Sequence, residues 1–349
     1  MCDAPESKNL IGMDQRRLKE LVLSYKQPAF RAGQLFKWIH NRRCFSFEEM
    51  TDLPKDFRRS ISQNESLLLP EISVVRTSKK DGTKKFLLTL YDGNKVEAVL
   101  MKYSYGYSLC ISSQVGCDMG CRFCASTIGG RLRNLTAAEL LGQIYAIEKT
   151  LAPDERVSRV VVMGTGEPLL NYDNLLTFIR LITDESGANL SIRHITVSTC
   201  GIVPGIRRLA DEGLAITLAL SLHAPEQPLR ESLMPIAASY PLNEVMKACD
   251  DYFDKTGRRV TYEYALINGI NDGPEHISRL GQLFKGRPAH INLIPLNAVD
   301  ELGLLPPPPE RVNSFAKGLE KSGINVTIRR SLGSDIDGAC GQLRRKESL

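Results

Sequence analysis

The chain has 349 residues, of which 42% are hydrophobic and 24% charged, and its net charge is +5. These fractions are typical of a globular protein and exclude collagen-like, coiled-coil and disordered classes. No apolar run reaches the roughly 20 residues of a membrane span, and the N-terminus lacks the apolar region of a secretory signal. We therefore expect a cytoplasmic protein with no membrane partner. Its nine cysteines would be reduced and serve chemistry or metal binding.

The excess positive charge lies at the start of the chain. Residues 1–85 hold 17 Lys and Arg against 11 Asp and Glu, whereas the other 264 residues hold 28 against 29. A basic module on a near-neutral core is typical of nucleic-acid binding, although a solvated surface explains the same counts. Lys79-Lys80 and Lys84-Lys85 bracket a predicted turn, where they either form a solvated tip or meet phosphates.

In chain order, the first predicted elements form a small helical module followed by a β extension. Apolar residues at helical spacing predict helices over 14–26, 28–43 and 55–63. Alternating apolar and polar residues predict a β-hairpin and a following strand, over 71–77, 84–91 and 91–103.

From about residue 108 the pattern changes to strands that alternate with helices. We expect strands over 108–113, 157–163, 193–198, 215–221, 260–266, 290–295 and 324–329. We expect helices between them over 136–150, 172–184, 204–212, 241–255, 274–286 and 309–322. Thr136 with Glu139 forms a capping box before the first of these helices.

Strict alternation predicts an α/β fold with a parallel sheet and crossover helices. About six such units fit an incomplete (β/α)6 barrel, whose reactive end is the C-terminal edge of the strands. A doubly wound fold would have a glycine-rich nucleotide motif after the first strand, and none is present. The predicted domains are a basic helical accessory domain, a β extension, the partial barrel and a C-terminal segment, over 1–68, 69–105, 106–330 and 331–349.

The most specific motif is Cys117-Asp-Met-Gly-Cys121-Arg-Phe-Cys124, directly after the first barrel strand. Three thiolates on one short loop can face one soft metal centre, but they are one short of the four that close a structural zinc site. On a [4Fe–4S] cluster they leave one iron open for a small ligand. The alternatives are a zinc site completed by another cysteine and three cysteines of the core.

This C-x3-C-x2-C spacing, with Phe123 before the last cysteine, resembles the radical S-adenosylmethionine (SAM) superfamily. The resemblance implies a [4Fe–4S] cluster whose open iron binds SAM and whose electron cleaves SAM to a 5′-deoxyadenosyl radical. It also implies a glycine-rich strand end that contacts SAM, which VVVMGTGEPLLN over 160–171 supplies. Gly164 and Gly166 permit close backbone approach, and Glu167 offers a carboxylate to the SAM ammonium group.

Longer segments narrow the resemblance to the RNA adenine-C2 methyltransferases of the RlmN type. They include CISSQVGC, MGTGEPLLN, HITVSTCGIVP, SLHAP, NLIPLN and VTIRRSLGSDIDGACGQL, and FRAGQLFKWIH resembles that family's N-terminal RNA-binding module. The resemblance implies methylation of an adenine in 23S rRNA at the peptidyl transferase centre and of the adenine 3′ of the anticodon in tRNAs. A flavodoxin-like reductant is implied by the family, and we expect a monomer.

The resemblance also assigns roles to individual residues. The implied cluster ligands are Cys117, Cys121 and Cys124. The implied SAM contacts are Gly166, Glu167, Ser198, Ser221, Leu222, His223 and Asn297. The implied catalytic residues are Cys340, Cys110 and Glu97.

The chemistry explains why two further cysteines are required. Adenine C2 is electron-poor and cannot attack a SAM methyl group as a nucleophile, so a carbon radical must be delivered. In the implied scheme the Cys340 thiolate takes a methyl group from one SAM, and a second SAM provides the radical that abstracts hydrogen from it. The methylene radical adds to C2, and proton loss to Glu97 leaves a protein–RNA crosslink. Cys110 then attacks the Cys340 sulfur, and the disulfide releases the RNA.

Three other readings remain open on the residues alone. A related Cfr-type enzyme methylates adenine C8, but Gly166-Glu167-Pro168 and Pro295 favour the C2 enzymes. A non-catalytic zinc RNA-binding protein would use Cys110 with the three clustered cysteines. A radical SAM enzyme acting on a small molecule would not need the basic module. The remaining cysteines are predicted to be packing residues or terminal, namely Cys44, Cys200, Cys249 and Cys2.

Overall fold

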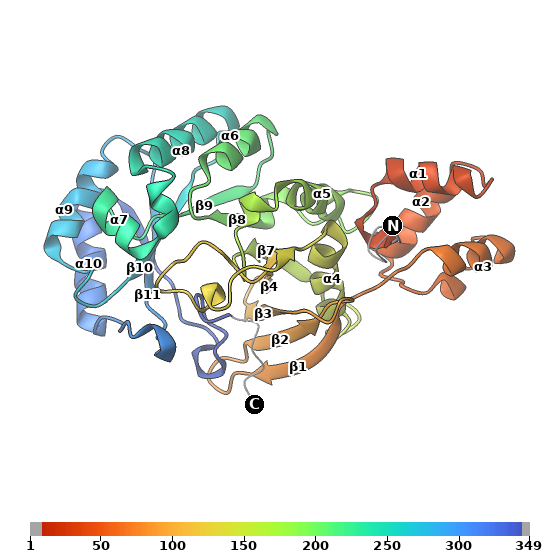
Figure 1. Ribbon diagram of the computed structural model, residues 1–349, viewed down its shortest axis with the longest axis horizontal. Coiled ribbons are helices and arrows are strands. Elements are labelled where there is room, and N and C mark those ends of the chain that lie inside the picture. Colours follow the sequence, from red (N-terminus) through yellow and green to blue (C-terminus); the bar gives the residue numbers. More distant parts are fainter. Residues whose placement is uncertain (1–8, 344–349) are drawn as a thin grey trace.

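The computed structural model describes residues 9–343. The sequence predicts a frayed end for the C-terminal RRKESL. This segment and Cys2 lie outside the described residues. Figure 1 shows the N-terminal helices as a separate lobe at one end of the molecule, with helices α9 (Pro274–Leu283) and α10 (Pro309–Lys321) at the other. In the part of the chain that the structure describes, no helix is both long and apolar enough to cross a membrane.

The N-terminal lobe contains helices α1 (Gln15–Ser24), α2 (Arg31–Phe36) and α3 (Lys55–Asn64). The Asp14 side chain caps α1 by accepting a hydrogen bond from the backbone N–H of Arg17. The helix expected over 28–43 begins at Arg31 and ends in a π-helical turn over Lys37–Asn41. Two side chains of this turn contact the rest of the molecule: His40 lies 2.8 Å from the Tyr145 hydroxyl, and Asn41 donates to the Gly187 oxygen at 3.3 Å.

One ten-stranded sheet runs through the rest of the molecule, in the order β1-β2-β3-β4-β7-β8-β9-β10-β11-β12. Its first strands pair antiparallel, namely β1 (Glu71–Thr77), β2 (Lys84–Thr89), β3 (Lys95–Tyr103) and β4 (Gly106–Cys110). From β4 onward the pairing is parallel, through β7 (Val157–Val162), β8 (Ile195–Thr199), β9 (Thr217–Ser221), β10 (Thr261–Leu266), β11 (His290–Pro295) and β12 (Asn325–Ile328).

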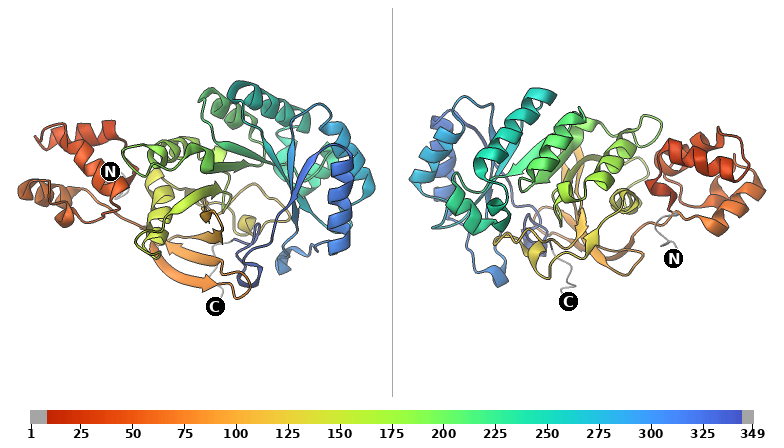
Figure 2. Two further views of the ribbon diagram at one scale, coloured as in Figure 1. Left: turned by 180° about the vertical axis from the view of Figure 1, so that it is seen from behind. Right: turned by 45° about the horizontal axis from the view of Figure 1, so that its top comes forward.

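Crossover helices join these parallel strands, and Figure 2 shows them along the outer side of the sheet. They are α4 (Ala137–Glu148), α5 (Tyr172–Thr183), α6 (Val203–Asp211), α7 (Gln227–Leu233), α8 (Leu242–Thr256), α9 and α10. The Thr136–Glu139 capping box at the start of α4 is present as expected. The sheet order is open at both ends, so the expected incomplete barrel with an N-terminal helical domain and a β extension is confirmed.

Besides short 3-10 helices, the structure adds one helix and one pair of short strands to the elements expected from the sequence. Helix α7 was missed because its seven residues include Pro228 and are too few for a clear helical period. The two-residue strands β5 (Gln114–Val115) and β6 (Arg133–Asn134) pair with each other and close the base of the cysteine loop. Such short pairings carry no periodicity that a sequence reveals.

The prediction that Lys85 lies at an exposed hairpin tip is wrong. Lys85 does not lie at a solvated hairpin tip, because its side chain is buried and forms an ion pair with Glu97 at 2.7 Å. It also donates a hydrogen bond to the backbone oxygen of Asp337 at 3.0 Å. Lys79 and Lys80 remain exposed in the turn.

Candidate active site

The cysteine motif forms a loop between β5 and β6, at the C-terminal end of β4. Gly116 starts this loop with φ +77°, and a Cβ atom there would lie 1.9 Å from the Gly130 oxygen. The loop is braced by Asp118, whose carboxylate accepts hydrogen bonds from the backbone and side chain of Arg131 at 2.7 and 3.1 Å. Glycine at 116 therefore lets the two ends of the loop lie directly against each other.

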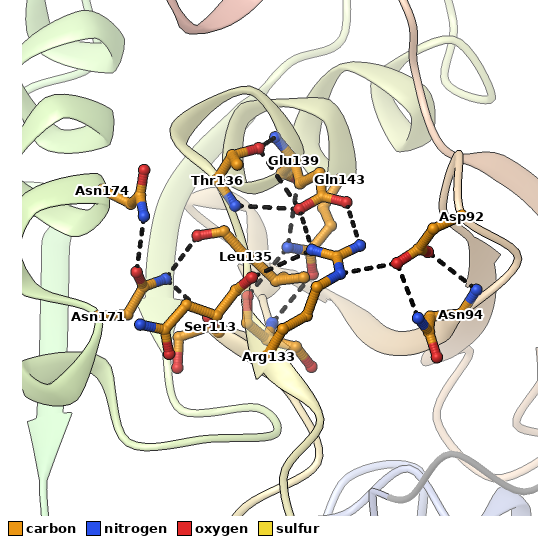
Figure 3. A network of polar contacts seen from close by, with 12 residues as sticks. Asp92, Asn94, Ser113, Arg133, Leu135, Thr136, Glu139, Gln143, Asn171 and Asn174 are labelled. Atoms are coloured by element: carbon orange, nitrogen blue, oxygen red, sulfur yellow. Dashed lines mark hydrogen bonds and ion pairs between the residues drawn. The ribbon is translucent and has the colours of Figure 1, made fainter. Parts of the chain in front are cut away.

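A polar network supports the base of this loop (Figure 3). Arg133 of β6 donates two hydrogen bonds to the Glu139 carboxylate, both at 2.7 Å, and a third to Asp92 at 2.7 Å. The Asn171 side-chain amide donates to the backbone oxygens of Ser113 and Leu135 at 2.9 and 2.6 Å. The network therefore fixes the cysteine loop to α4 and to the turn between β2 and β3.

The C-terminal ends of the parallel strands surround a pocket with an empty volume of about 1020 Å³. The three clustered cysteines and seven other residues expected from the sequence line it together, namely Gly166, Glu167, Ser198, Ser221, His223, Asn297 and Cys340. Leu222 does not line the pocket, because its side chain is fully buried in the core. Segments far apart in the chain are thus brought to the barrel edge that the fold predicts as reactive.

The donors on the cysteine loop suit an iron–sulfur cluster. Burial raises the pKa of the Cys117 thiol to about 11 and that of Cys121 above its usual range. These thiols stay protonated unless a cation replaces the protons. Within residues 9–343, no three His, Cys, Asp or Glu side chains gather closely enough to hold a single metal ion. Three soft donors that line one roomy pocket fit an iron–sulfur cluster and leave space for SAM.

Glu167 closes one wall of the pocket. Its carboxylate accepts hydrogen bonds from the backbone N–H groups of Cys200 at 2.8 Å and Leu169 at 3.0 Å. Burial raises its pKa, while these hydrogen bonds act in the opposite direction. A Cβ atom at Gly166 would lie 2.6 Å from the Gln114 side chain, so the neighbouring strand β5 requires glycine there.

His223 lies against the cysteine loop, and its ring is held in one orientation. Its φ is +56°, and its Nδ1 accepts a hydrogen bond from the backbone N–H of Ala265 at 2.8 Å. The ring packs edge-on against Phe123 with the centroids 4.5 Å apart. Burial and the nearby Arg230 charge lower its pKa to about 3, so the imidazole is neutral. With Nδ1 accepting, Nε2 carries the proton and can donate to a ligand.

Cys340 lies on the C-terminal segment and lines both this pocket and a neighbouring one of about 540 Å³. The segment is tied to the cysteine loop, because the Gly341 oxygen accepts a hydrogen bond from the backbone N–H of Ala125 at 2.7 Å. The Asn297 side chain donates to the Cys340 oxygen at 3.1 Å. These contacts hold the backbone at Cys340, a residue that the two pocket linings share.

Cys110 lines the neighbouring pocket from the end of β4, so Cys110 and Cys340 share one cavity wall. Burial raises the pKa of the Cys110 thiol to about 12, the nearby Cys340 raises it further, and Arg329 lowers it. The same desolvation raises the pKa of the Cys340 thiol, and Arg329 again acts in the opposite direction. The Arg329 guanidinium therefore acts on both thiols that the sequence singled out.

Glu97 lies outside both pockets, on the sheet face that carries Cys110. It is two residues from Val99, which pairs with Cys110 across β3 and β4, and side chains two apart share a face. The Ser112 hydroxyl donates to the Glu97 backbone oxygen at 2.7 Å, which places Glu97 at the C-terminal edge of the parallel strands. Its carboxylate is engaged by Lys85.

Sequence reasoning missed two charged residues of the pocket, Glu263 and Arg329. Glu263 is in the middle of an apolar strand, and register places it beside Ser221 and Asn292 on the inner face. Its Oε1 accepts a hydrogen bond from Asn292 at 2.9 Å, and its Oε2 lies 3.9 Å from Arg329. The sequence signal for Glu263 was a charged residue at an inward-facing position of an otherwise apolar strand. Cys200, expected to be a packing residue, also lines the pocket.

The partial barrel, the cysteine loop and the pocket define a radical SAM enzyme. A family model of the radical SAM superfamily matches residues 111–280, and one of the ribosomal RNA large subunit methyltransferase N-terminal domain matches residues 8–67. Among solved structures, a radical SAM methyltransferase from Sphaerobacter thermophilus is 39% identical with a TM-score of 0.93, covering 97% of this chain and 99% of that one.

Curated relatives specify the family. A probable dual-specificity RNA methyltransferase RlmN of Symbiobacterium thermophilum is 52% identical over 338 residues, which is 97% of this chain and 91% of that protein. A protein of the same name from Lachnospira eligens is 54% identical over 320 residues, covering 92% of this chain and 91% of that protein. The chain belongs to the RlmN family of radical SAM RNA methyltransferases, whose cofactors are a [4Fe–4S] cluster and SAM.

Proposed function

We propose that this enzyme methylates C2 of an adenine in 23S rRNA, at the peptidyl transferase centre, and C2 of the adenine 3′ of the anticodon in tRNAs. Relatives at 52% and 54% identity carry the name dual-specificity RNA methyltransferase, which supports two RNA substrates. The observation that carries the proposal is the position of Cys340, between the pocket of the clustered cysteines and the pocket of Cys110. A methyl carrier must reach a SAM donor on one side and a resolving thiol on the other.

The proposed cluster ligands are Cys117, Cys121 and Cys124. When bound, the cluster supplies the electron that cleaves SAM to a carbon radical. The pocket residues serve to orient SAM, with the Glu167 carboxylate beside its ammonium group and the neutral His223 donating from Nε2. The apolar pocket walls exclude water, which protects a reactive carbon centre.

Two thiols have successive roles in this proposal. The Cys340 thiolate accepts the methyl group and later forms the carbon–carbon bond to the base through that carbon. The Cys110 thiolate then attacks the Cys340 sulfur, so that a disulfide forms and the methylated adenine leaves. Arg329 supports both steps, because a positive charge stabilises each thiolate.

We assign the proton acceptor for adenine C2 to Glu97. Its location at the reactive edge of the sheet and on the face of Cys110 supports this role. Lys85 supplies the positive charge that a buried carboxylate requires. Substrate entry would bring the base next to the C-terminal segment, to which Lys85 is also bonded.

The N-terminal lobe is proposed to hold the RNA. Residues 1–85 carry the whole net positive charge of the chain, and the matched methyltransferase N-terminal domain covers residues 8–67 of that part. We further propose that the enzyme acts as a monomer in the cytoplasm and receives its electron from a flavodoxin-like reductant.

The direct test is product analysis with anaerobically prepared enzyme, SAM, a low-potential reductant and either a 23S rRNA fragment or tRNA. Nucleoside mass spectrometry should find 2-methyladenosine from both RNAs, and none with the Cys340→Ala variant. The product 8-methyladenosine would overturn the assignment in favour of a Cfr-type enzyme. Turnover of a free nucleoside that is insensitive to salt would instead indicate a small-molecule enzyme.

A further inference from the structure

A buried arginine behind the cysteine loop lacks a counter-charge. Arg230 lies on α7 and has no solvent-exposed surface. Its Nη2 donates to the backbone oxygens of Cys200 at 2.6 Å and Ser221 at 3.4 Å. Its Nε and Nη1 are buried without any hydrogen-bond partner. No carboxylate in the described part of the chain lies within ion-pair distance of it.

Such a group is costly to bury. A guanidinium stays protonated in proteins, and an isolated buried charge without an anion costs several kcal/mol. Both residues that Nη2 contacts, Cys200 and Ser221, line the same pocket as Cys121, whose thiol acts electrostatically on Arg230. Cys121 is a proposed cluster ligand, and a cysteine loses its proton when it binds iron. The missing anion is therefore created beside Arg230 when the cluster binds.

We propose that Arg230 is the electrostatic partner of the iron–sulfur centre and raises its reduction potential. The proposal rests on the assignment of Cys117, Cys121 and Cys124 as the ligands. Three thiolates on a [4Fe–4S]²⁺ core give a net charge of −1, and one electron from the reductant makes it −2. A fixed positive charge stabilises the −2 state more than the −1 state, because the attraction grows with charge. Arg230 therefore makes the electron easier to accept.

A purely structural role for Arg230 explains only some of its contacts. The Nη2 atom alone holds the Cys200 and Ser221 oxygens, at the ends of β8 and β9. A lysine or glutamine can donate to these oxygens as well, without bringing two further buried donors. A structural role leaves the buried positive charge and the unpartnered Nε and Nη1 unexplained, whereas a cluster-bound thiolate nearby compensates that charge.

The test compares Arg230→Lys, Arg230→Gln and Arg230→Met with wild type, all anaerobically reconstituted, in a redox titration monitored by electron paramagnetic resonance. The neutral variants should show at least a tenfold lower ratio of reduced to oxidised cluster at a given potential, which is a 59 mV lower midpoint. Arg230→Lys should remain closer to wild type. The control is Arg258→Met, which removes a half-buried arginine with an unpartnered Nε from the turn after α8.

A second measurement uses the cluster-free protein. There the charge of Arg230 is uncompensated, so Arg230→Met should unfold at a temperature no lower than wild type. With the cluster bound, wild type should gain more thermal stability than Arg230→Met and should release iron to a chelator more slowly.

Unchanged midpoints in both neutral variants would overturn the role of Arg230 and leave the cluster ligands untouched. A wild-type protein without iron and sulfide would overturn the ligand assignment and, with it, this proposal. If Arg230→Met does not fold, the lysine and glutamine variants still show whether the charge sets the midpoint. Both variants keep a hydrogen-bond donor, and only lysine keeps the positive charge.

Discussion

Cys340 and Cys110 show how much a site depends on single residues from distant parts of the chain. They are 230 positions apart in sequence and line the same pocket. Because the two cysteines line one pocket, the proposed mechanism has a covalent intermediate that a substitution of Cys110 can trap. If Cys110 resolves a crosslink between Cys340 and RNA, its loss must leave that crosslink in place.

We therefore expect Cys110→Ala to accumulate a covalent protein–RNA adduct and to release almost no methylated RNA. Denaturing gels should show the shifted protein, and peptide mapping should place the adduct at Cys340. Cys249→Ala is the matched control, because Cys249 is a buried thiol of α8 outside both pockets. Continued multiple turnover by Cys110→Ala would contradict the two-thiol mechanism.

The Lys85–Glu97 ion pair gives a prediction about stability. Removing one partner leaves the other charge buried and unpaired, so Lys85→Met and Glu97→Gln should each lower the free energy of unfolding by about 3–5 kcal/mol. The double variant should lose clearly less than the sum of the two single losses, since it leaves no unpaired charge. Urea unfolding of the cluster-free protein measures all three. Additive losses would mean that the two side chains act independently.

Residue motifs in the sequence were sufficient to locate most of the pocket but not its charged interior. The cysteine loop and the glycine-rich segment are local patterns whose spacing is informative. Glu263 and Arg329 join the pocket only because strand register turns them inward beside distant residues. Leu222 shows the converse, because its neighbours Ser221 and His223 line the pocket while its own side chain packs into the core.

At the scale of elements, the β extension has a role that its charge pattern did not reveal. The turn between β1 and β2 is bonded to the segment that carries Cys340, which lies beside β2 and β3 in Figure 1. The Asp81 carboxylate accepts a hydrogen bond from the backbone N–H of Gly333 at 2.9 Å. The Asp335 carboxylate accepts one from the backbone N–H of Lys79 at 3.0 Å. Two buried strands and a turn thus position a loop that has no regular structure of its own.

Asp81→Ala should loosen this segment without unfolding the protein. The variant loses the bond to Gly333, so amide hydrogen exchange in 331–343 should accelerate by an amount that corresponds to about 1–3 kcal/mol of local stability. Product formation should fall because Cys340 is held less firmly. Asp154→Ala, an exposed acidic residue between α4 and β7, is the control. Unchanged exchange in 331–343 would show that the turn does not restrain the segment.

Across the whole molecule, the order of elements followed from the alternation of strands and helices. The predicted parallel strands overlap the observed ones because each is a short apolar run between helical periods. The attachment of the N-terminal lobe could not be predicted, since it depends on side chains that meet only in three dimensions. His40 lies at this joint with its Nδ1 2.8 Å from the Tyr145 hydroxyl of α4, and Arg43 pairs with Glu148 at 2.9 Å.

The buried histidine makes the stability of the molecule depend on pH. Burial, together with the Arg43 charge, lowers the pKa of His40 from 6.5 to about 3. Between these values the unfolded chain binds a proton that the folded chain does not bind, so stability falls as the pH falls below 6.5. The loss from His40 alone is about 1.4 kcal/mol at pH 5.5. His223, whose pKa is lowered to about 3 in the same way, adds a similar loss.

We therefore expect urea unfolding at pH 7.5, 6.5 and 5.5 to show wild-type stability that decreases across the last step. His40→Gln cannot take up this proton, so its stability should decrease by about 1.4 kcal/mol less between pH 7.5 and 5.5. Between pH 8.5 and 7.5 the two proteins should change in parallel, which serves as the internal control. An equal acid dependence in both proteins would show that His40 is protonated in the folded state as readily as in the unfolded chain.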